Sequence, residues 1–88
     1  IYKNVIEDTN LGEDLHLTEI CMQPFMVGKS LVELALPKRF GVMVVGIRRG
    51  VGGKVMYPSP QELLQAQDNL IIVSGEEAIP KLVRGESS

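Results

Sequence analysis

The sequence predicts a small α+β domain with a mostly antiparallel, four-stranded sheet and two short helices, in the order β-α-β-β-β-α. Residues 42–47 form a run of β-branched and apolar residues, which is typical of a strand buried on both faces. Glycine- and proline-rich breaks separate the short apolar segments along the chain. The 88 residues, 44% of them hydrophobic, can form one small core but not two domains.

The expected domain covers residues 14–84. Residues 1–13 are expected to be a linker or the end of a preceding helix, because a turn-prone stretch at 10–14 separates them from the first predicted strand. Residues 85–88 read as a polar tail. Since the first residue is Ile1, we expect the chain to be a fragment of a longer protein.

The first strand is predicted to run from Leu15 to Gln23, where apolar residues alternate and β-branched ones are frequent. Pro24 ends it because proline cannot donate to a sheet ladder. Glu19 falls on the more apolar face, so the two faces of this strand are not cleanly separated.

The first helix is predicted to start near Ser30, since Ser30 and Glu33 have the spacing of a capping box. Pro37 and Gly41 are expected to close it. The apolar residues of this helix fall on one face; they are Leu31, Leu34 and Ala35.

The second half of the chain is predicted to begin with a hairpin, in which residues 42–47 pair with residues 55–57 across a glycine-rich loop. A proline corner follows, and residues 61–67 form a short helical or turn segment with two inward leucines. The last strand covers 70–73, and a terminal helix opens with acidic residues at 76–77. The inward leucines and the helix proline are Leu63, Leu64 and Pro80, the last acceptable only in a first turn.

Charge and cysteine content exclude several classes of function. A net charge of −2 gives no concentrated basic face for nucleic acid or for an anionic membrane surface. No apolar run approaches the roughly 20 residues of a membrane helix, so we expect no direct membrane insertion within this stretch. The single cysteine, Cys21, excludes an intramolecular disulfide and is consistent with a reducing compartment.

The sequence offers no catalytic set, so we expect a protein that is not an enzyme. The only histidine, His16, has no cysteine or acid at a triad-like or metal-ligand spacing, and a strand would place His16 and Cys21 on opposite faces. No base is placed beside Cys21 by the sequence. We therefore expect no catalytic residue and no metal site.

Two loops suggest anion binding. Gly28-Lys29-Ser30 resembles the end of a phosphate-binding loop, but Gln23 stands where the upstream glycine is required, so a helix start is favoured. Arg48 and Arg49 precede a glycine-rich loop and are candidate anion contacts, although such a loop is more often a solvated hairpin tip. The N-terminal acidic residues lack the ligand spacing of a calcium loop.

Four segments, in order and at matching spacing, resemble the RCK C-terminal (TrkA-C type) domains of potassium channels and transporters. Residues 27–34 resemble a GK-S/T-L-x-E-L helix start, and residues 39–50 resemble a K-Y-G-V-N-V-V-A-I-R-R-G strand and turn. Residues 58–60 and 64–75 match the later P-x-P and L-x-x-G-D-x-L-x-V-x-G segments, with Gln67 in place of the usual glycine.

The resemblance implies a cytoplasmic homodimer at the inner face of the cell membrane. Such domains follow a Rossmann-type RCK N-terminal domain or attach to a membrane channel or transporter subunit, and they sense small-molecule or cyclic dinucleotide effectors. The first hypothesis is therefore a dimerising, ligand-sensing regulator of potassium transport. The alternatives are an assembly domain of another transporter (anion, dicarboxylate or cation/proton antiporter) and a cytosolic regulator that uses the domain as a sensor.

The resemblance also implies a ligand pocket at five positions. Pro37 and Met43 stand where members that bind cyclic di-adenosine monophosphate have an arginine and an asparagine, so we do not expect this dinucleotide to be the ligand. No other cofactor is implied. The pocket positions are Leu36, Pro37, Val42, Met43 and Pro58.

Overall fold

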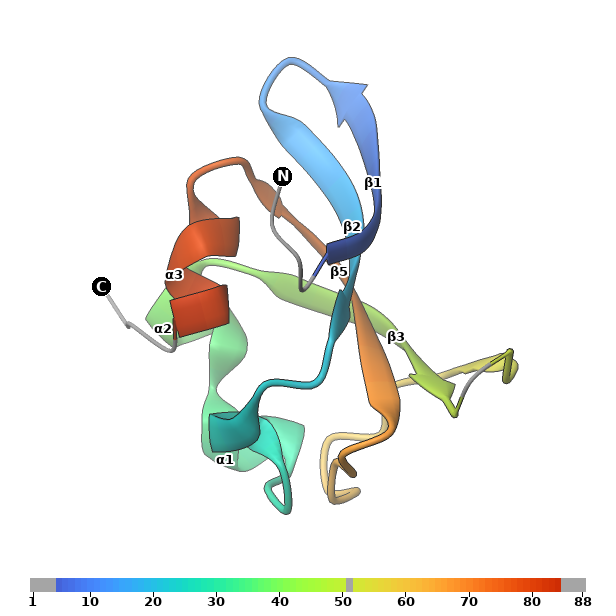
Figure 1. The fold of residues 1–88 in the computed structure, drawn as a ribbon. Helices are drawn as coiled ribbons and strands as arrows, with labels where there is room; N and C mark the ends of the chain where they lie inside the picture. Colours follow the sequence, from blue (N-terminus) through green and yellow to red (C-terminus); the bar gives the residue numbers. More distant parts are fainter. Residues whose placement is uncertain (1–4, 51, 85–88) are drawn as a thin grey trace.

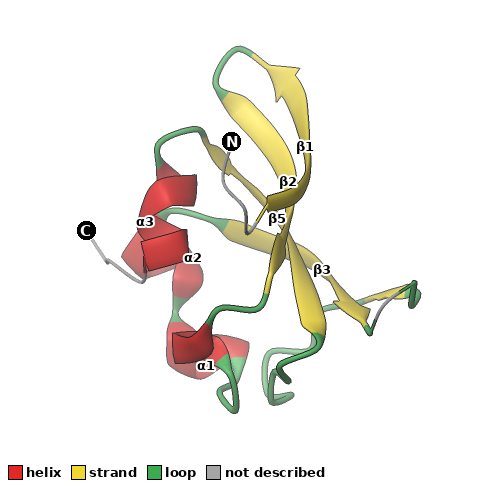
Figure 2. Cartoon of the chain, in the orientation of Figure 1, coloured by secondary structure: helices red, strands yellow, loops and turns green. Residues whose placement is uncertain are grey.

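The computed structural model describes residues 5–50 and 52–84. Its centre is a curled, five-stranded antiparallel sheet in the order β1-β2-β5-β3-β4, with short helices against one face (Figures 1 and 2). The β1–β2 hairpin projects from one end of the sheet, and the β3–β4 hairpin lies at the other. The strands are β1 (Val5–Gly12), β2 (Leu15–Cys21), β3 (Met43–Arg49), β4 (Val55–Met56) and β5 (Asp68–Gly75), and the helices are the 3-10 turn η1 (Pro24–Met26), α1 (Leu31–Leu34), α2 (Leu36–Phe40) and α3 (Ala78–Arg84).

The α+β class with an antiparallel sheet is confirmed, but the predicted number of four strands is wrong. Residues 5–12 form β1, which pairs with β2, and are neither a linker nor the end of a helix. Every residue of β1 after Val5 is exposed, so the strand carries no buried apolar face from which it could be predicted. The expectations for residues 1–4 and for the 85–88 tail lie outside the described residues.

The predicted single helix after Ser30 is two helices. Ala35 adopts a left-handed conformation, with φ 49°, and separates α1 from α2. Pro37 lies in the first turn of α2 and does not end a helix, because the fixed φ of proline suits a position whose N–H has no intrahelical partner. Gly41, with φ 73°, caps α2 in the left-handed region that glycine adopts without a Cβ penalty.

The core lies between the sheet and the helices. Alternate residues of β5 face it, with Leu70 and Ile72 fully buried, because β5 is the central strand and pairs with β2 and β3. Leu64 is buried as predicted, whereas Leu63 is 54% exposed and the inward position predicted for it is wrong. The other large buried core residues come from β2, the helices and the region of β3: Ile20, Met26, Leu34, Leu36, Val42, Ile47 and Leu82.

Candidate functional site

An open groove of about 320 Å³ lies between α1, α2, the start of β3 and the segment that follows β4. Its lining is apolar, with no charged side chain, and the Tyr57 hydroxyl is its one polar side-chain group. Such a surface favours apolar or aromatic contacts, since a buried charge without a partner is costly. The lining residues are Leu31, Val32, Leu36, Pro37, Met43, Val44, Tyr57, Pro58 and Pro60.

The α1 wall is held by a capping box. The Glu33 backbone N–H donates to Ser30 Oγ at 3.2 Å, and the Ser30 backbone N–H donates to Glu33 Oε1 at 3.0 Å. The Val32 N–H then donates to the carbonyl of Pro60 at 3.1 Å, which joins α1 to the opposite wall. The two walls therefore form one hydrogen-bonded unit, although residues 30 and 60 lie far apart in sequence.

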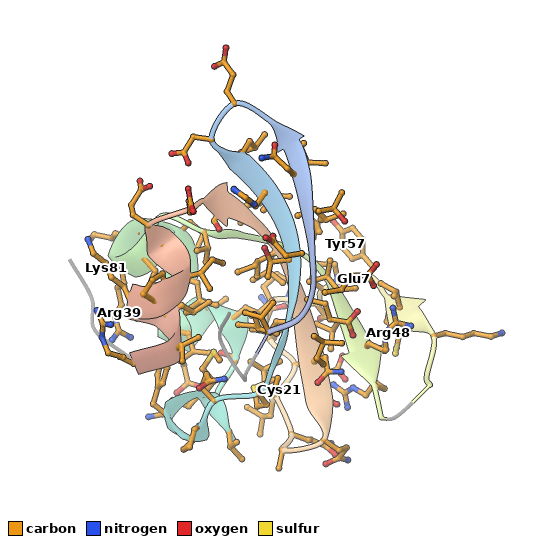
Figure 3. The ribbon with its side chains drawn as sticks, turned by 45° about the horizontal axis from the view of Figure 1, so that its top comes forward. Glu7, Cys21, Arg39, Arg48, Tyr57 and Lys81 are labelled. Atoms are coloured by element: carbon orange, nitrogen blue, oxygen red, sulfur yellow. The ribbon has the colours of Figure 1, made fainter. Side chains whose placement is uncertain are left out.

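The rim of the groove carries large apolar side chains that nothing in the described chain covers. Tyr57 is 89% exposed, Met43 62% and Val32 61%. Tyr57 lies on the side of the molecule that also carries Arg48 (Figure 3). Because a contiguous exposed apolar patch is unusual on a monomer, the groove is the strongest candidate for contact with a ligand or a protein.

The structure brings four of the five predicted pocket residues together. Leu36, Pro37, Met43 and Pro58 line the groove, whereas Val42 is 1% exposed and belongs to the core. Binding of a ligand by these residues stays a prediction. The Tyr-Pro-Ser-Pro corner was a usable sequence signal for part of the remaining lining. The lining residues that were not predicted are Leu31, Val32, Val44, Tyr57 and Pro60.

Arg48 is held by carboxylate and carbonyl oxygens. Its Nε donates to Glu19 Oε2 at 2.8 Å, its Nη2 to Glu19 Oε1 at 3.3 Å, and its Nη1 to the Gly53 carbonyl at 2.9 Å. These hydrogen bonds to Glu19, together with the attraction between the two charges, raise the pKa of the guanidinium above its usual value. Glu19, whose apolar-face position was unexplained in the sequence, therefore serves as the partner of Arg48.

The Arg48–Glu19 pair lies in a second, smaller hollow of about 180 Å³, which is lined by residues of β1, β2, β3 and β5. Asn69 donates to Glu19 Oε2 at 3.2 Å, and Glu7 also lines the hollow (Figure 3). The hollow is therefore occupied by an internal polar network that satisfies the charges of its own side chains.

Arg49 is also paired with acids. It forms ion pairs with Glu62 and, at 3.5 Å, with the fully buried Asp68. Asp68 in turn accepts the Gln65 backbone N–H at 2.9 Å, which fixes the turn before β5. Since both guanidinium groups have carboxylate partners, an anion contact by Arg48 or Arg49 stays a prediction that requires these pairs to open.

His16 and Cys21 lie at opposite ends of β2. His16 Nδ1 is 3.2 Å from both carboxylate oxygens of Asp8, and Cys21 is a half-buried free thiol opposite Asn69.

Within the described part of the chain, no helix has the length and apolarity needed to span a membrane.

Comparison with known proteins gives three kinds of similarity. The sequence profile of the TrkA-C domain family matches residues 23–84. The chain is 34% identical over 77 residues to the Ktr system potassium uptake protein A of Vibrio alginolyticus, covering 88% of this chain and 34% of that protein. It is 27% identical over 73 residues to the Ktr system potassium uptake protein C of Bacillus subtilis, covering 83% and 33%. The chain thus spans about a third of these curated relatives.

Solved structures share the fold. The GsuK RCK domain superposes with a TM-score of 0.75 at 20% identity, covering 93% of this chain and 18% of that one. The RCK C domain of the potassium transport protein KtrA, in complex with cyclic diadenosine monophosphate, gives 0.71 at 21% identity, covering 78% and 80%. The family profile covers more than half of the sequence, and the fold agrees with it. This chain belongs to the TrkA-C domain family.

Proposed function

We propose that this chain is a cytosolic, non-enzymatic regulatory module of a potassium transport system, which pairs with a second copy of itself and senses an effector. The observation that carries the proposal is the open apolar groove, with Val32, Met43 and Tyr57 on its exposed rim. The transport context comes from the two relatives named for potassium uptake, of which the chain matches about a third of the length.

The groove favours pairing because its rim contains apolar area without an internal partner. Burial of apolar surface is worth roughly 25 cal/mol per Å², so covering the rim with a second copy would be favourable. A two-fold pair would place the same patch of each copy against the other. A small domain also gains stability from association, since a short chain buries a modest fraction of its own surface.

The chemistry of the groove favours an uncharged or aromatic effector. The KtrA RCK C domain is described in complex with cyclic diadenosine monophosphate, which carries phosphates. In this chain Pro37 and Met43 line the groove and no lining residue is charged, so a phosphate would lack the charge-assisted hydrogen bonds that stabilise it. We therefore propose that this dinucleotide is not the effector here.

Regulation follows if the effector prefers one arrangement of the two copies. The α1 and Pro60 walls are joined by the Val32 N–H, so an effector seated between them would act on both walls together. An effector with unequal affinity for two arrangements shifts the population between them. The attached parts would be a Rossmann-type RCK N-terminal domain or a channel or transporter subunit.

A structural role without an effector is the second candidate. The capping box and the Val32–Pro60 hydrogen bond hold the groove walls through contacts internal to the chain, which favours a surface already shaped for a partner. In that case the module would assemble the subunits of a potassium transporter, or of an anion, dicarboxylate or cation/proton carrier, by dimerising.

Analytical ultracentrifugation combined with a thermal-shift screen tests the proposal. We expect a reversible dimer, and an uncharged or aromatic effector that raises the melting temperature by binding the folded state. Nucleotides and cyclic diadenosine monophosphate form the comparison set. A dimer that no compound stabilises would favour the structural role. A chain that stays monomeric at all concentrations, with no stabilising compound, would contradict both.

A further inference from the structure

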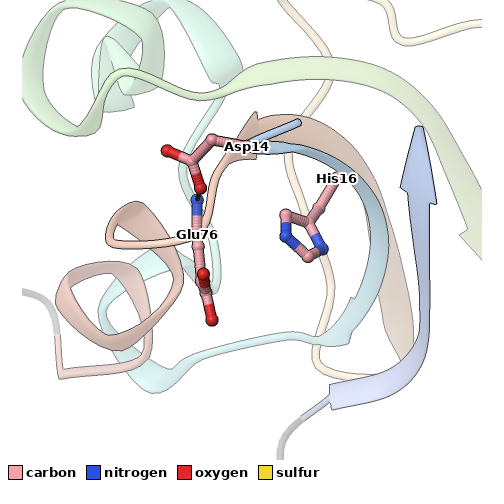
Figure 4. A group of neighbouring side chains, drawn as sticks. All are labelled: Asp14, His16 and Glu76. Carbon is pink, nitrogen blue, oxygen red and sulfur yellow. Dashed lines mark hydrogen bonds between the residues drawn. The ribbon is translucent and has the colours of Figure 1, made fainter. Parts of the chain in front are cut away.

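We propose that Asp14, His16 and Glu76 form a binding site for a divalent transition-metal ion, separate from the apolar groove. The site lies where the β1–β2 hairpin meets the loop between β5 and α3. One ligand atom from each of the three side chains lies within 4.8 Å of the other two (Figure 4). The sequence conceals this set, because Glu76 is distant from the other two residues along the chain.

The imidazole of His16 is oriented for coordination. Its Nδ1 is 3.2 Å from both oxygens of Asp8, and Thr18 Oγ1 donates to Asp8 Oδ1 at 2.9 Å. A carboxylate only accepts hydrogen bonds, so this contact favours the proton on Nδ1, and in that tautomer of the neutral ring Nε2 offers its lone pair to a metal ion. In Figure 4 the ring lies toward Asp14 and Glu76. A carboxylate behind a histidine is the arrangement that fixes the tautomer of metal-ligating histidines.

The two acidic ligands are brought together by the main chain around Gly75. The Glu76 backbone N–H donates to Asp14 Oδ1 at 3.4 Å. A Cβ on Gly75 would lie 3.2 Å from Glu77 Oε1 and 3.5 Å from Asp14 Oδ2, so the carboxylates of Asp14 and Glu77 converge over this glycine. Glu77 therefore adds negative charge beside the site, although the ligand set itself consists of Asp14, His16 and Glu76.

An independent observation supports a cation at this position. Among residues 5–50 and 52–84, no lysine or arginine forms an ion pair with Asp14, Glu76 or Glu77. Elsewhere Glu19 and Asp68 are each neutralised by an arginine. Within the described ranges these three like charges therefore lie near one another with no ion-paired cation, and a divalent cation would reduce their mutual repulsion.

The ligand set selects the kind of ion. One imidazole nitrogen with two carboxylate oxygens suits Zn²⁺ or Mn²⁺ better than Mg²⁺ or Ca²⁺, which prefer all-oxygen sites. Tetrahedral bonds of about 2.1 Å require ligand atoms about 3.4 Å apart, closer than the present limit of 4.8 Å. Asp14 and Glu76 are exposed and can rotate toward His16, while water fills the remaining position.

A bound ion would join the β1–β2 hairpin to the start of α3. Asp14 and His16 belong to the hairpin, whereas Glu76 directly precedes α3. The ion would therefore stabilise the folded state and order the hairpin that projects from the sheet. This effect does not depend on the groove, so the metal site and the regulatory proposal succeed or fail separately.

Isothermal titration calorimetry of the metal-free chain with ZnCl₂, MnCl₂ and MgCl₂ tests the site. We expect one saturable site for Zn²⁺ or Mn²⁺, and an affinity reduced by about 10- to 100-fold in Asp14→Asn, Glu76→Gln and His16→Gln. Glu13→Gln, which changes a neighbouring acid outside the set, and Cys21→Ser should bind as the unaltered chain does.

Two outcomes would overturn the proposal. The first is the absence of saturable binding. The second is undiminished binding in Asp14→Asn and Glu76→Gln, or loss of binding in Cys21→Ser. Because Asp14 and Glu76 are exposed, these near-isosteric variants retain the fold even if His16→Gln does not. Paramagnetic broadening by Mn²⁺ in NMR spectra gives a second readout, since amides of residues 14–16 and 75–77 should disappear first and broadening centred elsewhere would contradict the site.

Discussion

Two neighbouring strands of the sheet carry apolar residues with opposite roles. Ile72 of β5 is fully buried under the helices, whereas Met43, at the start of the adjacent β3, is 62% exposed on the groove rim. The core side chain loses its contact with water when the chain folds, and the rim side chain can lose it only by binding something else. Apolar residues in this domain therefore stabilise either the fold or an association, depending on whether they face the core or the groove rim.

The core should show the largest effect on folding. Leu70 is 0% exposed on the central strand, so Leu70→Ala should lower the free energy of unfolding by about 2–5 kcal/mol, through lost burial and a residual cavity. Urea unfolding followed by circular dichroism measures this. Leu11→Ala, at a position 51% exposed on β1, is the control and should stay within about 0.5 kcal/mol. Equal effects in the two variants would remove the distinction between core and surface.

The contact between β3 and β4, beside the Tyr57 side of the groove, should show the second largest effect on stability. A Cβ on Gly46 would lie 2.6 Å from Cγ1 of Val55, so Gly46→Ala must either turn the Val55 side chain or displace β4, which leads to Tyr57 on the groove rim. We expect a loss of about 1–3 kcal/mol, with weakened amide protection around β4 in hydrogen exchange. Gly75→Ala in metal-free buffer is the matched control, because its Cβ meets the movable end of Glu77 and should cost less. A neutral Gly46→Ala would show that the Val55 side chain turns aside and that this contact does not hold β4 in place.

Loss of the capping box that holds the α1 wall should have a smaller effect on stability. Ser30→Ala removes the side-chain acceptor of the Glu33 N–H and should destabilise the domain by about 1 kcal/mol. Ser59→Ala serves as the comparison, since no described hydrogen bond involves the Ser59 hydroxyl. If the two serine variants have equal stability in denaturant unfolding, the capping box does not hold α1.

The sheet was predictable where one strand face is apolar, and unpredictable where neither face is. The strands around residues 15–21, 43–49, 55–56 and 68–75 were each anticipated, because β-branched runs and glycine or proline breaks mark them. β1 was missed because nearly all of its residues are exposed and its few apolar residues do not form one apolar face, so only pairing with β2 makes it a strand.

The groove was anticipated in part. Leu36, Pro37, Met43 and Pro58 reach it, but Val42 precedes Met43 by one residue and faces the core, as the alternation of an extended segment requires. Tyr57 was not predicted, although the proline-rich corner that follows it was a usable signal for an exposed aromatic residue. The Asp14, His16 and Glu76 set was excluded by spacing along the chain, because the sheet brings its members together only after folding.

The most direct test of the groove is its role in pairing. Sedimentation velocity across a range of concentrations should show a reversible dimer for the unaltered chain, and Met43→Lys should raise the dimer dissociation constant at least about tenfold, leaving unfolding of the monomer within about 0.5 kcal/mol. Leu11→Lys, at a similarly exposed apolar position outside the groove, should dimerise normally. A chain that remains monomeric, or a Met43→Lys variant that pairs as well as Leu11→Lys, would contradict the account.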